Sequence, residues 1–367
     1  AVEAAASTGG QLMPPVMGAA AFLMAEFVGV PYFDVVKAAT IPALLYFLGI
    51  WLGVHFEARR SNLKGVPRSE LPKPWEILKE RGHLAIPLIV IIYLLVSGFT
   101  PMRAALWAIV LAIAASSLRK STRMKPVEIV RGLENGARNV LGVLVACASA
   151  GIIIGVVTKT GVGLKLASAL LDLSGGMLLP TMFFTMITSI ILGMGVPTTA
   201  NYVITSTIAA PALVQMGVPV LAAHMFVFYF GIIADVTPPV ALAAFAGSAI
   251  SGGKPLKTGI NASKLAIAAF IIPYIFVLSP VVLMIDATPI SLITVLVTSV
   301  IGMVGLSASM IGCLVKPLNG LERVMLFVGG LLMIQPGLVT DLVGFLLLAS
   351  VLFFQQRRSK AEASSLS

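Results

Sequence analysis

The residues best suited to binding chemistry lie where helix-breaking and polar types interrupt an apolar chain. Segment 193–201 reads GMGVPTTAN, and the sequence on both sides of it is apolar enough to lie in lipid. Segments 235–239 (DVTPP) and 8–15 (TGGQLMPP) interrupt apolar runs in a similar way. Unpaired backbone groups at such breaks are costly in lipid, so the breaks persist only where something polar fills them. Three of them in one chain predict a transport site at membrane depth.

In segment 193–201 the glycines can end one helix, and Pro197 disfavours its continuation. Thr198, Thr199 and Asn201 then offer side-chain oxygens beside the freed carbonyls. Oxygen ligands of this kind suit a hard cation such as sodium, whereas a transition metal would favour His, Cys or clustered carboxylates. We therefore expect sodium as a coupling ion and no other cofactor. The residues assigned to sodium are Gly193, Gly195, Val196, Pro197, Thr198, Asp235, Thr237 and Pro238.

Segment 235–239 contains Asp235, the one carboxylate in this pair of motifs. Thr237 is expected to cap a helix that begins with Pro238, because the missing amide hydrogen of proline costs nothing in a first turn. The positive end of that half-helix, next to a cation, suits an anionic substrate. The residues expected to border this substrate are Thr199, Asn201, Thr237 and Ser149.

Simpler explanations exist for each feature taken alone. One break of this kind is also typical of a plain kink in a membrane helix. Asp235 could serve only as a helix cap near the interface. The small residues around Ser149, in the glycine-rich region 139–163, fit close helix packing. The breaks are repeated, and Thr and Asn lie beside them, which favours a transport site over these simpler explanations.

The composition indicates a polytopic membrane protein. Of 367 residues, 58% are hydrophobic and 11% are charged, and the mean hydropathy is +1.02, too apolar for a water-soluble surface. The net charge of +10 comes from short loops and the C-terminus, which fits membrane topology better than nucleic-acid binding. Cys147 and Cys313 lie in apolar runs without disulfide or metal spacing, so both are interpreted as core residues.

Several apolar runs are candidates for crossings of about 20 residues each. They lie near 38–56, 84–99, 102–118, 139–158, 177–193, 221–234, 264–285, 289–315 and 324–354. The basic loops 55–83 and 119–138 and the tail 357–360 are expected to face the cytoplasm. The sequence therefore predicts an all-α fold with many crossings.

An internal repeat links two of the breaks. Aligning the PPV strings at 14–16 and 238–240 also aligns two alanines in the apolar helix that follows each string. Segment 193–201 has no earlier counterpart. We expect that counterpart to precede Ala1, in a longer protein of which this chain is a fragment.

At these residues the chain resembles the large membrane subunit of the tripartite ATP-independent periplasmic (TRAP) transporters. More narrowly, it is similar to the fused small-plus-large permeases that work with TAXI-type soluble receptors. The strings that carry the resemblance are GMGVPTTANYVITSTIAAPAL at 193–213, FGIIADVTPPVALAAFAGSAISGG at 230–253 and EAAASTGGQLMPPVMGAAAF at 3–22. The resemblance runs from residue 1 to about 285.

The resemblance implies a sodium-driven secondary importer of the elevator type in the bacterial or archaeal cytoplasmic (inner) membrane. Its implied partners are the lipid bilayer, a small-membrane-subunit region and a periplasmic TAXI-type solute-binding protein that delivers a small carboxylate. It also implies two inverted repeats, each with a re-entrant hairpin and a broken helix. By position, 193–201 would be the hairpin tip of the second repeat and 235–239 its broken helix. The first repeat's broken helix would contain Thr8, Gly9, Gln11, Pro14 and Pro15.

On this basis the chain divides into four parts. Residues 1–37 would end the first repeat, 38–124 would form scaffold helices with a basic cytoplasmic loop, 125–285 would form the second inverted repeat, and 286–367 would add C-terminal helices and a basic tail. The hairpin of the first repeat and the small-subunit region would lie before Ala1. One of two sodium sites would then be incomplete in this chain.

Other functions stay open at this stage. A receptor-independent sodium/carboxylate symporter of the same architecture is the closest alternative. A channel would need rings of like charge or filter-type repeats, which the sequence lacks. A membrane enzyme would need a nucleophile and a base or paired acids, and Asp235 has no evident partner.

Overall fold

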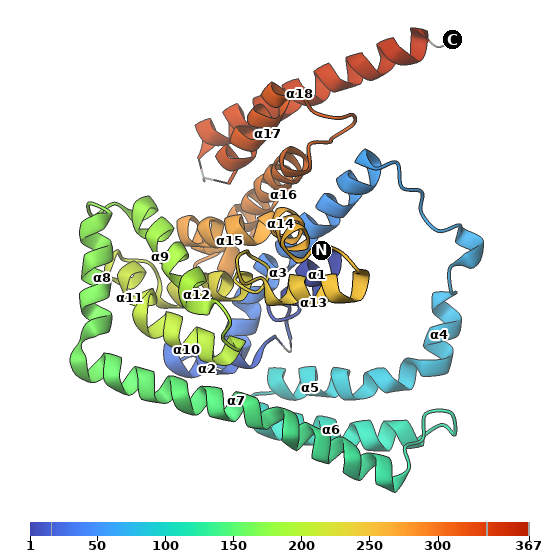
Figure 1. Ribbon diagram of the computed structural model, residues 1–367, viewed down its shortest axis with the longest axis vertical. Coiled ribbons are helices and arrows are strands. Elements are labelled where there is room, and N and C mark those ends of the chain that lie inside the picture. Colours follow the sequence, from blue (N-terminus) through green and yellow to red (C-terminus); the bar gives the residue numbers. More distant parts are fainter. Residues whose placement is uncertain (16, 335–336, 366–367) are drawn as a thin grey trace.

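The computed structural model describes residues 1–15, 17–334 and 337–365, and within these ranges the chain is helical with no strand (Figure 1). Five helices of the described residues are long and apolar enough to cross a bilayer. They are α3 (Tyr32–Arg60), α7 (Pro126–Thr160), α14 with α15 (Pro255–Leu278), α16 (Pro289–Ile311) and the Leu338–Arg358 part of α18. The all-α membrane fold expected from the sequence is therefore confirmed.

The other helices are shorter, and several of them meet at the sequence breaks. They are α1 (Val2–Gly9), α2 (Ala19–Val28), α4 (Pro74–Arg81), α5 (Ile86–Val96), α6 (Pro101–Ser117), α8 (Val162–Leu173), α9 (Leu178–Gly193), α10 (Thr198–Ile208), α11 (Ala210–Gln215), α12 (Val220–Ile233), α13 (Leu242–Ser251) and α17 (Gly320–Leu332). α14 covers Pro255–Leu265, α15 covers Ile267–Leu278 and α18 covers Leu338–Ser365. Three 3-10 turns lie at Arg68–Glu70, Gly82–Ala85 and Pro280–Leu283.

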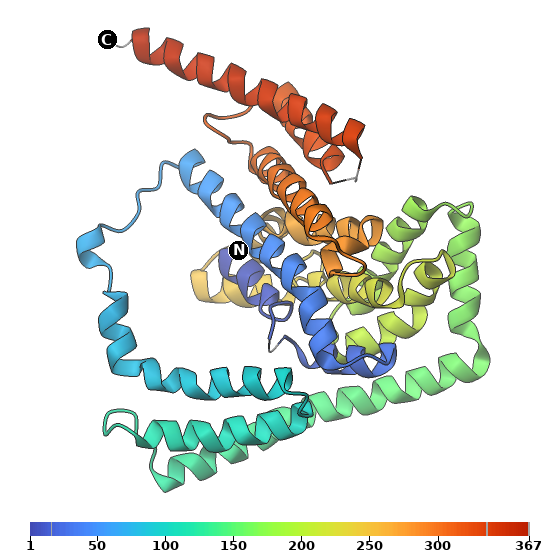
Figure 2. The same ribbon diagram turned by 180° about the vertical axis from the view of Figure 1, so that it is seen from behind.

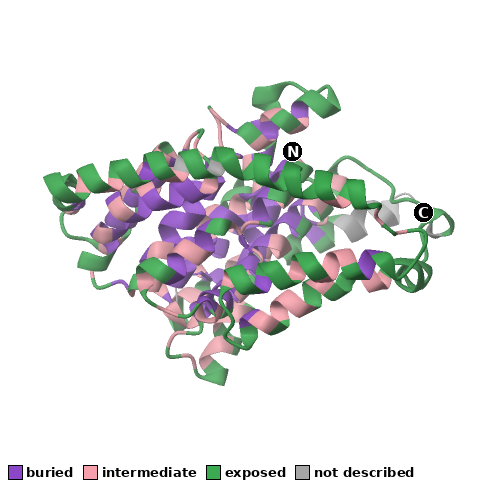
Figure 3. Cartoon of the chain, turned by 90° about the horizontal axis from the view of Figure 1, so that it is seen from below, coloured by how far each residue is buried: buried purple, intermediate pink, exposed green. Residues whose placement is uncertain are grey.

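Helix α12 forms the centre of the core. Apart from His224 it is apolar around its circumference, and a helix of that kind is stable only when it is surrounded. It packs between α9, α10 and α15, and its aromatic rings meet edge to face: Phe226 and Phe230 lie 4.7 Å apart, and Tyr229 and Phe276 lie 5.6 Å apart. Figure 3 shows buried residues concentrated in this central region.

Helices α5 and α6 form a hairpin apart from the core, and α7 extends along the same edge of the molecule (Figures 1 and 2). Much of α7 presents apolar side chains outward; Val140, Leu141, Leu144 and Val145 are all exposed. Such a surface suits lipid or another membrane segment and not water.

The C-terminal helices α16, α17 and α18 pack on α3 through α16. Glycines allow the close approach of α16 and α17. A Cβ on Gly302 would lie 2.9 Å from the carbonyl oxygen of Gly330, and a Cβ on Gly330 would lie 2.8 Å from that of Gly302. Small residues at such contacts are typical of helices that pack within a membrane.

Candidate functional site

The break between α9 and α10 follows the pattern of glycine and proline in the sequence. α9 ends at Gly193 and α10 begins at Thr198. Gly195, between them, has φ +73°, a left-handed conformation that side chains disfavour. The carbonyl of Pro197 accepts a backbone hydrogen bond from the first turn of α10. The turn thus ends one helix and begins another, as predicted.

Asn201, in the first turn of α10, connects the turn between α9 and α10 to the core. We call this turn, residues 193–201, the tip. The side chain is buried, and its Nδ2 donates a hydrogen bond of 2.8 Å to the carbonyl oxygen of Gly231 on α12. The contact requires a glycine at 193, because a Cβ there would lie 2.7 Å from Asn201 Nδ2. The Oδ1 atom of Asn201 is also buried, and it has no hydrogen-bond partner among the described residues. The tip therefore holds an unsatisfied acceptor inside the protein.

Thr198 joins the tip to the break near the start of the chain. Its Oγ1 donates a hydrogen bond of 2.6 Å to Oε1 of Gln11, which follows α1. The two residues are 187 positions apart. Two of the three interrupted segments thus meet through side chains that were assigned to the site from sequence.

The break at 235–239 differs from the prediction. The helix that follows it, α13, begins at Leu242 and not at Pro238, so Thr237 is not its N-cap. The hydroxyl of Thr237 instead donates 2.8 Å back to the carbonyl of Ile233, the last residue of α12. The physical reason is that a residue before proline is disfavoured in helical conformation, and both Thr237 and Pro238 precede a proline.

The two proline breaks share several backbone features in their described residues. Met17 and Ala241, each three residues after the first proline, have φ values of 51° and 42°. The amide of Met17 donates 3.2 Å to the Met13 carbonyl, and that of Ala241 donates 3.1 Å to the Thr237 carbonyl. The Pro14-Pro15 and Pro238-Pro239 peptide bonds are both cis. In this alignment Gln11 occupies the position of Asp235.

Asp235 lies half-buried just after α12. Its carbonyl accepts a hydrogen bond of 3.0 Å from the amide of Ala243, and the carbonyl of Gln11 accepts one of 3.0 Å from Gly18. No ion pair among the described residues involves the Asp235 carboxylate.

The other residues assigned in the second repeat are placed as follows. Thr199 is buried at the start of α10. Val196 packs against a small apolar cluster of Ala150, Ala200 and Val203. Ser149 is exposed on α7, beside Ala150, and makes no hydrogen bond in the described part of the chain to any residue of the breaks.

The residues assigned in the first repeat have local structural roles as well. The Thr8 hydroxyl donates 2.8 Å to the Ala4 carbonyl within α1. A Cβ on Gly9 would lie 2.9 Å from the ring of Phe47 on α3. The Pro15 carbonyl accepts a hydrogen bond of 2.9 Å from the Tyr32 hydroxyl. The contacts of Gly9 and Pro15 place the first break against α3.

Two contacts at the site were not foreseen from the sequence. One is the Gly231 carbonyl that pairs with Asn201, and the other is a hydrogen bond of 2.7 Å between the Tyr202 hydroxyl and Nδ1 of His224. Both fasten α10 to α12. No spacing in the sequence links these pairs, because their partners lie on different helices.

Comparison with known families gives the context for this geometry. The family model described as tripartite ATP-independent periplasmic transporter, DctM component, matches residues 1–291. The chain belongs to the DctM family. No curated protein and no solved structure gives a significant match.

The DctM match contains all three breaks and ends shortly after the start of α16. The resemblance to the large membrane component of TRAP transporters is therefore confirmed, and this DctM chain is a transporter component and not an enzyme. DctM components work with a periplasmic binding protein and a small membrane subunit. Helices α17 and α18 lie outside the matched region.

Proposed function

We propose that this DctM-family chain is the permease component of a sodium-coupled secondary transporter that imports small carboxylates delivered by a periplasmic receptor. The observation that carries the proposal is the hydrogen bond between Thr198 and Gln11, because it joins two of the helix breaks at one place. Broken helices that meet inside a membrane protein are where secondary transporters bind substrate and coupling ions.

The donor set near the tip fits sodium. Asn201 Oδ1 is buried and has no hydrogen-bond partner among the described residues, and an unsatisfied buried acceptor is costly unless a ligand binds it. The hydroxyl of Thr198 donates to Gln11, which leaves its own lone pairs available. Sodium would be held by these oxygens and by carbonyls of the 193–198 turn, with Asp235 supplying negative charge in the other break.

An anionic substrate fits the start of α10 better than the start of α13. α10 begins at Thr198, directly at the tip, whereas α13 begins at Leu242, beyond the prolines. The amide groups and dipole of a helix N-terminus favour negative charge. Thr199 in the first turn would then border a carboxylate, Asn201 would contribute through the sodium ion that its Oδ1 is proposed to hold, and Thr237 of the other break would complete the proposed site.

The finer family type is also part of the proposal. The added helices α17 and α18 support a fused permease of the kind that works with TAXI-type receptors, in a bacterial or archaeal inner membrane, and the paired breaks support an elevator mechanism. A receptor-independent sodium/carboxylate symporter of the same architecture is the alternative.

Uptake into proteoliposomes tests the proposal. The permease, together with its small-subunit region, is reconstituted with an inward sodium gradient and a labelled carboxylate, with and without the periplasmic receptor. We expect uptake that needs both the gradient and the receptor. Uptake that needs sodium but not the receptor would establish the symporter, and uptake with potassium in place of sodium would overturn sodium coupling.

A further inference from the structure

A cavity of about 680 Å³ lies where the C-terminal end of α3 meets the linker between α16 and α17. Four of its lining residues are cationic: Arg59, Arg60, Lys64 and Lys316. No Asp or Glu is among the described residues that line it. We call it the basic cavity. Its charge favours an anion.

The two arginines of the basic cavity are held in place by backbone groups. Arg59 Nη1 donates 3.2 Å to the carbonyl of Leu314, and Arg60 Nη1 donates 2.9 Å to the carbonyl of Ile311. A guanidinium has five N–H donors, so both retain donors for a ligand, although Arg60 also pairs with Glu57 at 2.9 Å. A fixed guanidinium suits the oxygens of a phosphate.

The basic cavity lies at the level where membrane spans end. The candidate spans Tyr32–Arg60 and Pro289–Ile311 both have their C-terminal ends there. A third candidate span, Leu338–Arg358 in α18, reaches the same level. There Gln355 Oε1 accepts a hydrogen bond of 2.9 Å from the backbone amide of Lys316. A basic cavity at the ends of spans lies beside lipid headgroups.

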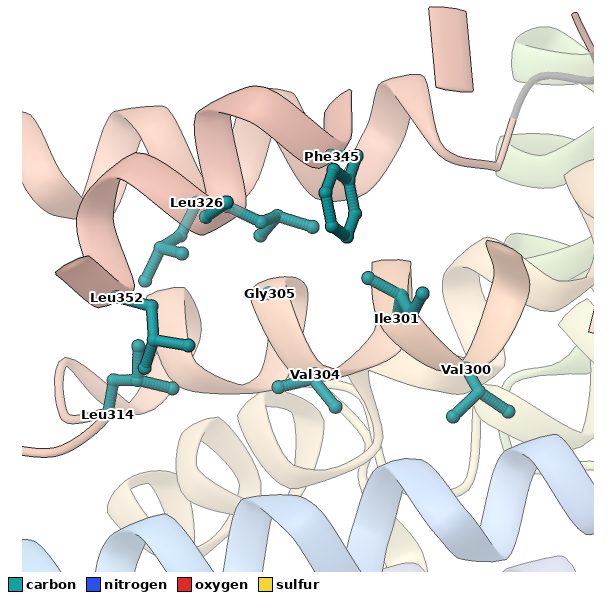
Figure 4. Close-up of a pocket in the computed structure, with 10 residues that line it drawn as sticks. Val300, Ile301, Val304, Gly305, Leu314, Leu326, Phe345 and Leu352 are labelled. Atoms are coloured by element: carbon teal, nitrogen blue, oxygen red, sulfur yellow. The ribbon is translucent and has the colours of Figure 1, made fainter. Parts of the chain in front are cut away.

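A second cavity, of about 310 Å³, lies between α16, α17 and α18 (Figure 4). We call it the apolar cavity. Its lining is apolar from Val300 to Leu314 along the α16 side and from Phe345 to Leu352 along α18. All of these residues except Leu314 belong to candidate spans, so most of the apolar cavity lies at hydrocarbon depth.

The linker after α16 brings the two cavities together. Cys313 and Val315 line the basic cavity, whereas Leu314, between them, lines the apolar cavity. Figures 1 and 2 show this linker beside the end of α3. An amphiphile with a charged group at the membrane surface and a chain in the hydrocarbon layer matches this arrangement.

We propose that the two cavities bind one anionic glycerophospholipid, with its phosphate in the basic cavity and one acyl chain in the apolar cavity. A free phosphate would use only the basic cavity. A zwitterionic lipid has the same phosphate, but it also brings an ammonium group, which the cationic residues that line the basic cavity would repel. The bound lipid would fasten α16–α18, which lie mostly outside the family match, to α3.

Native mass spectrometry of the purified full chain, with phosphatidylglycerol and phosphatidylethanolamine of identical acyl chains, tests the proposal. We expect phosphatidylglycerol to be retained more strongly. The variant Arg59→Gln with Lys64→Gln should lower its affinity about tenfold, since each basic residue contributes to binding of an anionic headgroup. Ala349→Leu, which fills the apolar cavity, should weaken both lipids.

The matched control is Lys120→Gln with Arg123→Gln, which removes the same charge from another basic loop and should leave lipid retention unchanged. If Arg59→Gln unfolds the linker, Lys64→Gln alone still tests whether the basic cavity binds the headgroup. Its loss should not disturb the fold, because Lys64 makes no ion pair in the described residues. Three results would overturn the proposal. They are equal retention of the two lipids, a loss of phosphatidylglycerol affinity in the control as large as in Arg59→Gln with Lys64→Gln, and displacement of phosphatidylglycerol by millimolar inorganic phosphate.

Discussion

The hydroxyl of Thr198 lies 2.6 Å from the amide oxygen of Gln11, although the two residues are 187 positions apart. Thr198 is the first residue of α10, and Gln11 lies in the break that follows α1. The bond fixes one helix break against another. If these breaks form the sodium and substrate site, the bond must matter for transport and not only for folding.

Replacing Thr198 by valine keeps the shape of the side chain and removes the donor to Gln11. We expect the sodium concentration for half-maximal uptake to rise about fivefold, since a hydrogen bond is worth about 1 kcal/mol. Thr198→Ser should behave as the original protein. Thr207→Val on the same helix is the control, because the Thr207 hydroxyl donates to the Val203 carbonyl within the helix and to no other group in the described part of the chain. Equal effects of Thr198→Val and Thr207→Val would contradict the prediction.

Asn201→Ala removes both the bond to Gly231 and the buried oxygen proposed to hold sodium. The Gly231 carbonyl then loses its side-chain donor, so we expect a loss of stability of about 1–3 kcal/mol in thermal unfolding. Sodium dependence of uptake should weaken as well, and Thr199→Ala should weaken it to a smaller extent. A sodium titration that stays unchanged in both variants would refute the assignment of these residues.

Gly193→Ala tests the close approach of the tip to α12. Its Cβ would lie 2.7 Å from Asn201 Nδ2 and 2.8 Å from the Gly231 carbonyl, so the tip must move. Overpacking of this kind costs about 1–3 kcal/mol, and we expect a lower melting temperature together with lost uptake. Gly151→Ala on α7 is the control, because its Cβ would meet no atom within 4 Å among the described residues outside its own stretch of helix. A melting temperature equal to that of the control would show that the tip is not packed as described.

Asp235→Asn removes the negative charge of the second proline break while it keeps the size of the side chain. We expect sodium affinity to fall by about tenfold or more, because a nearby carboxylate attracts a cation strongly where water is excluded. Asp172→Asn, at an exposed position near the end of α8, should have no effect. Sodium affinity that is the same in both variants would place Asp235 outside the ion site.

The N-cap prediction for Thr237 was wrong for a reason that the sequence contains. Proline disfavours the helical conformation in the residue before it, and Pro238 itself precedes Pro239. The helix therefore begins at Leu242, after the left-handed Ala241. Consecutive prolines in the first break have the same consequence, because α2 begins only at Ala19. The local rule argues against a helix that begins at the first proline, but it does not by itself give the starts at Leu242 and Ala19.

The sequence by itself determined that this is an all-α membrane protein of the DctM family, and it located the breaks. Those features depend on residue type and short-range spacing: apolar runs set the spans, and Gly and Pro set their interruptions. Only the tertiary structure decided that Thr198 meets Gln11, and that Asn201 pairs with Gly231 while its Oδ1 has no partner among the described residues. These contacts join helices distant in the chain, and they depend on packing around α12, which no local pattern specifies.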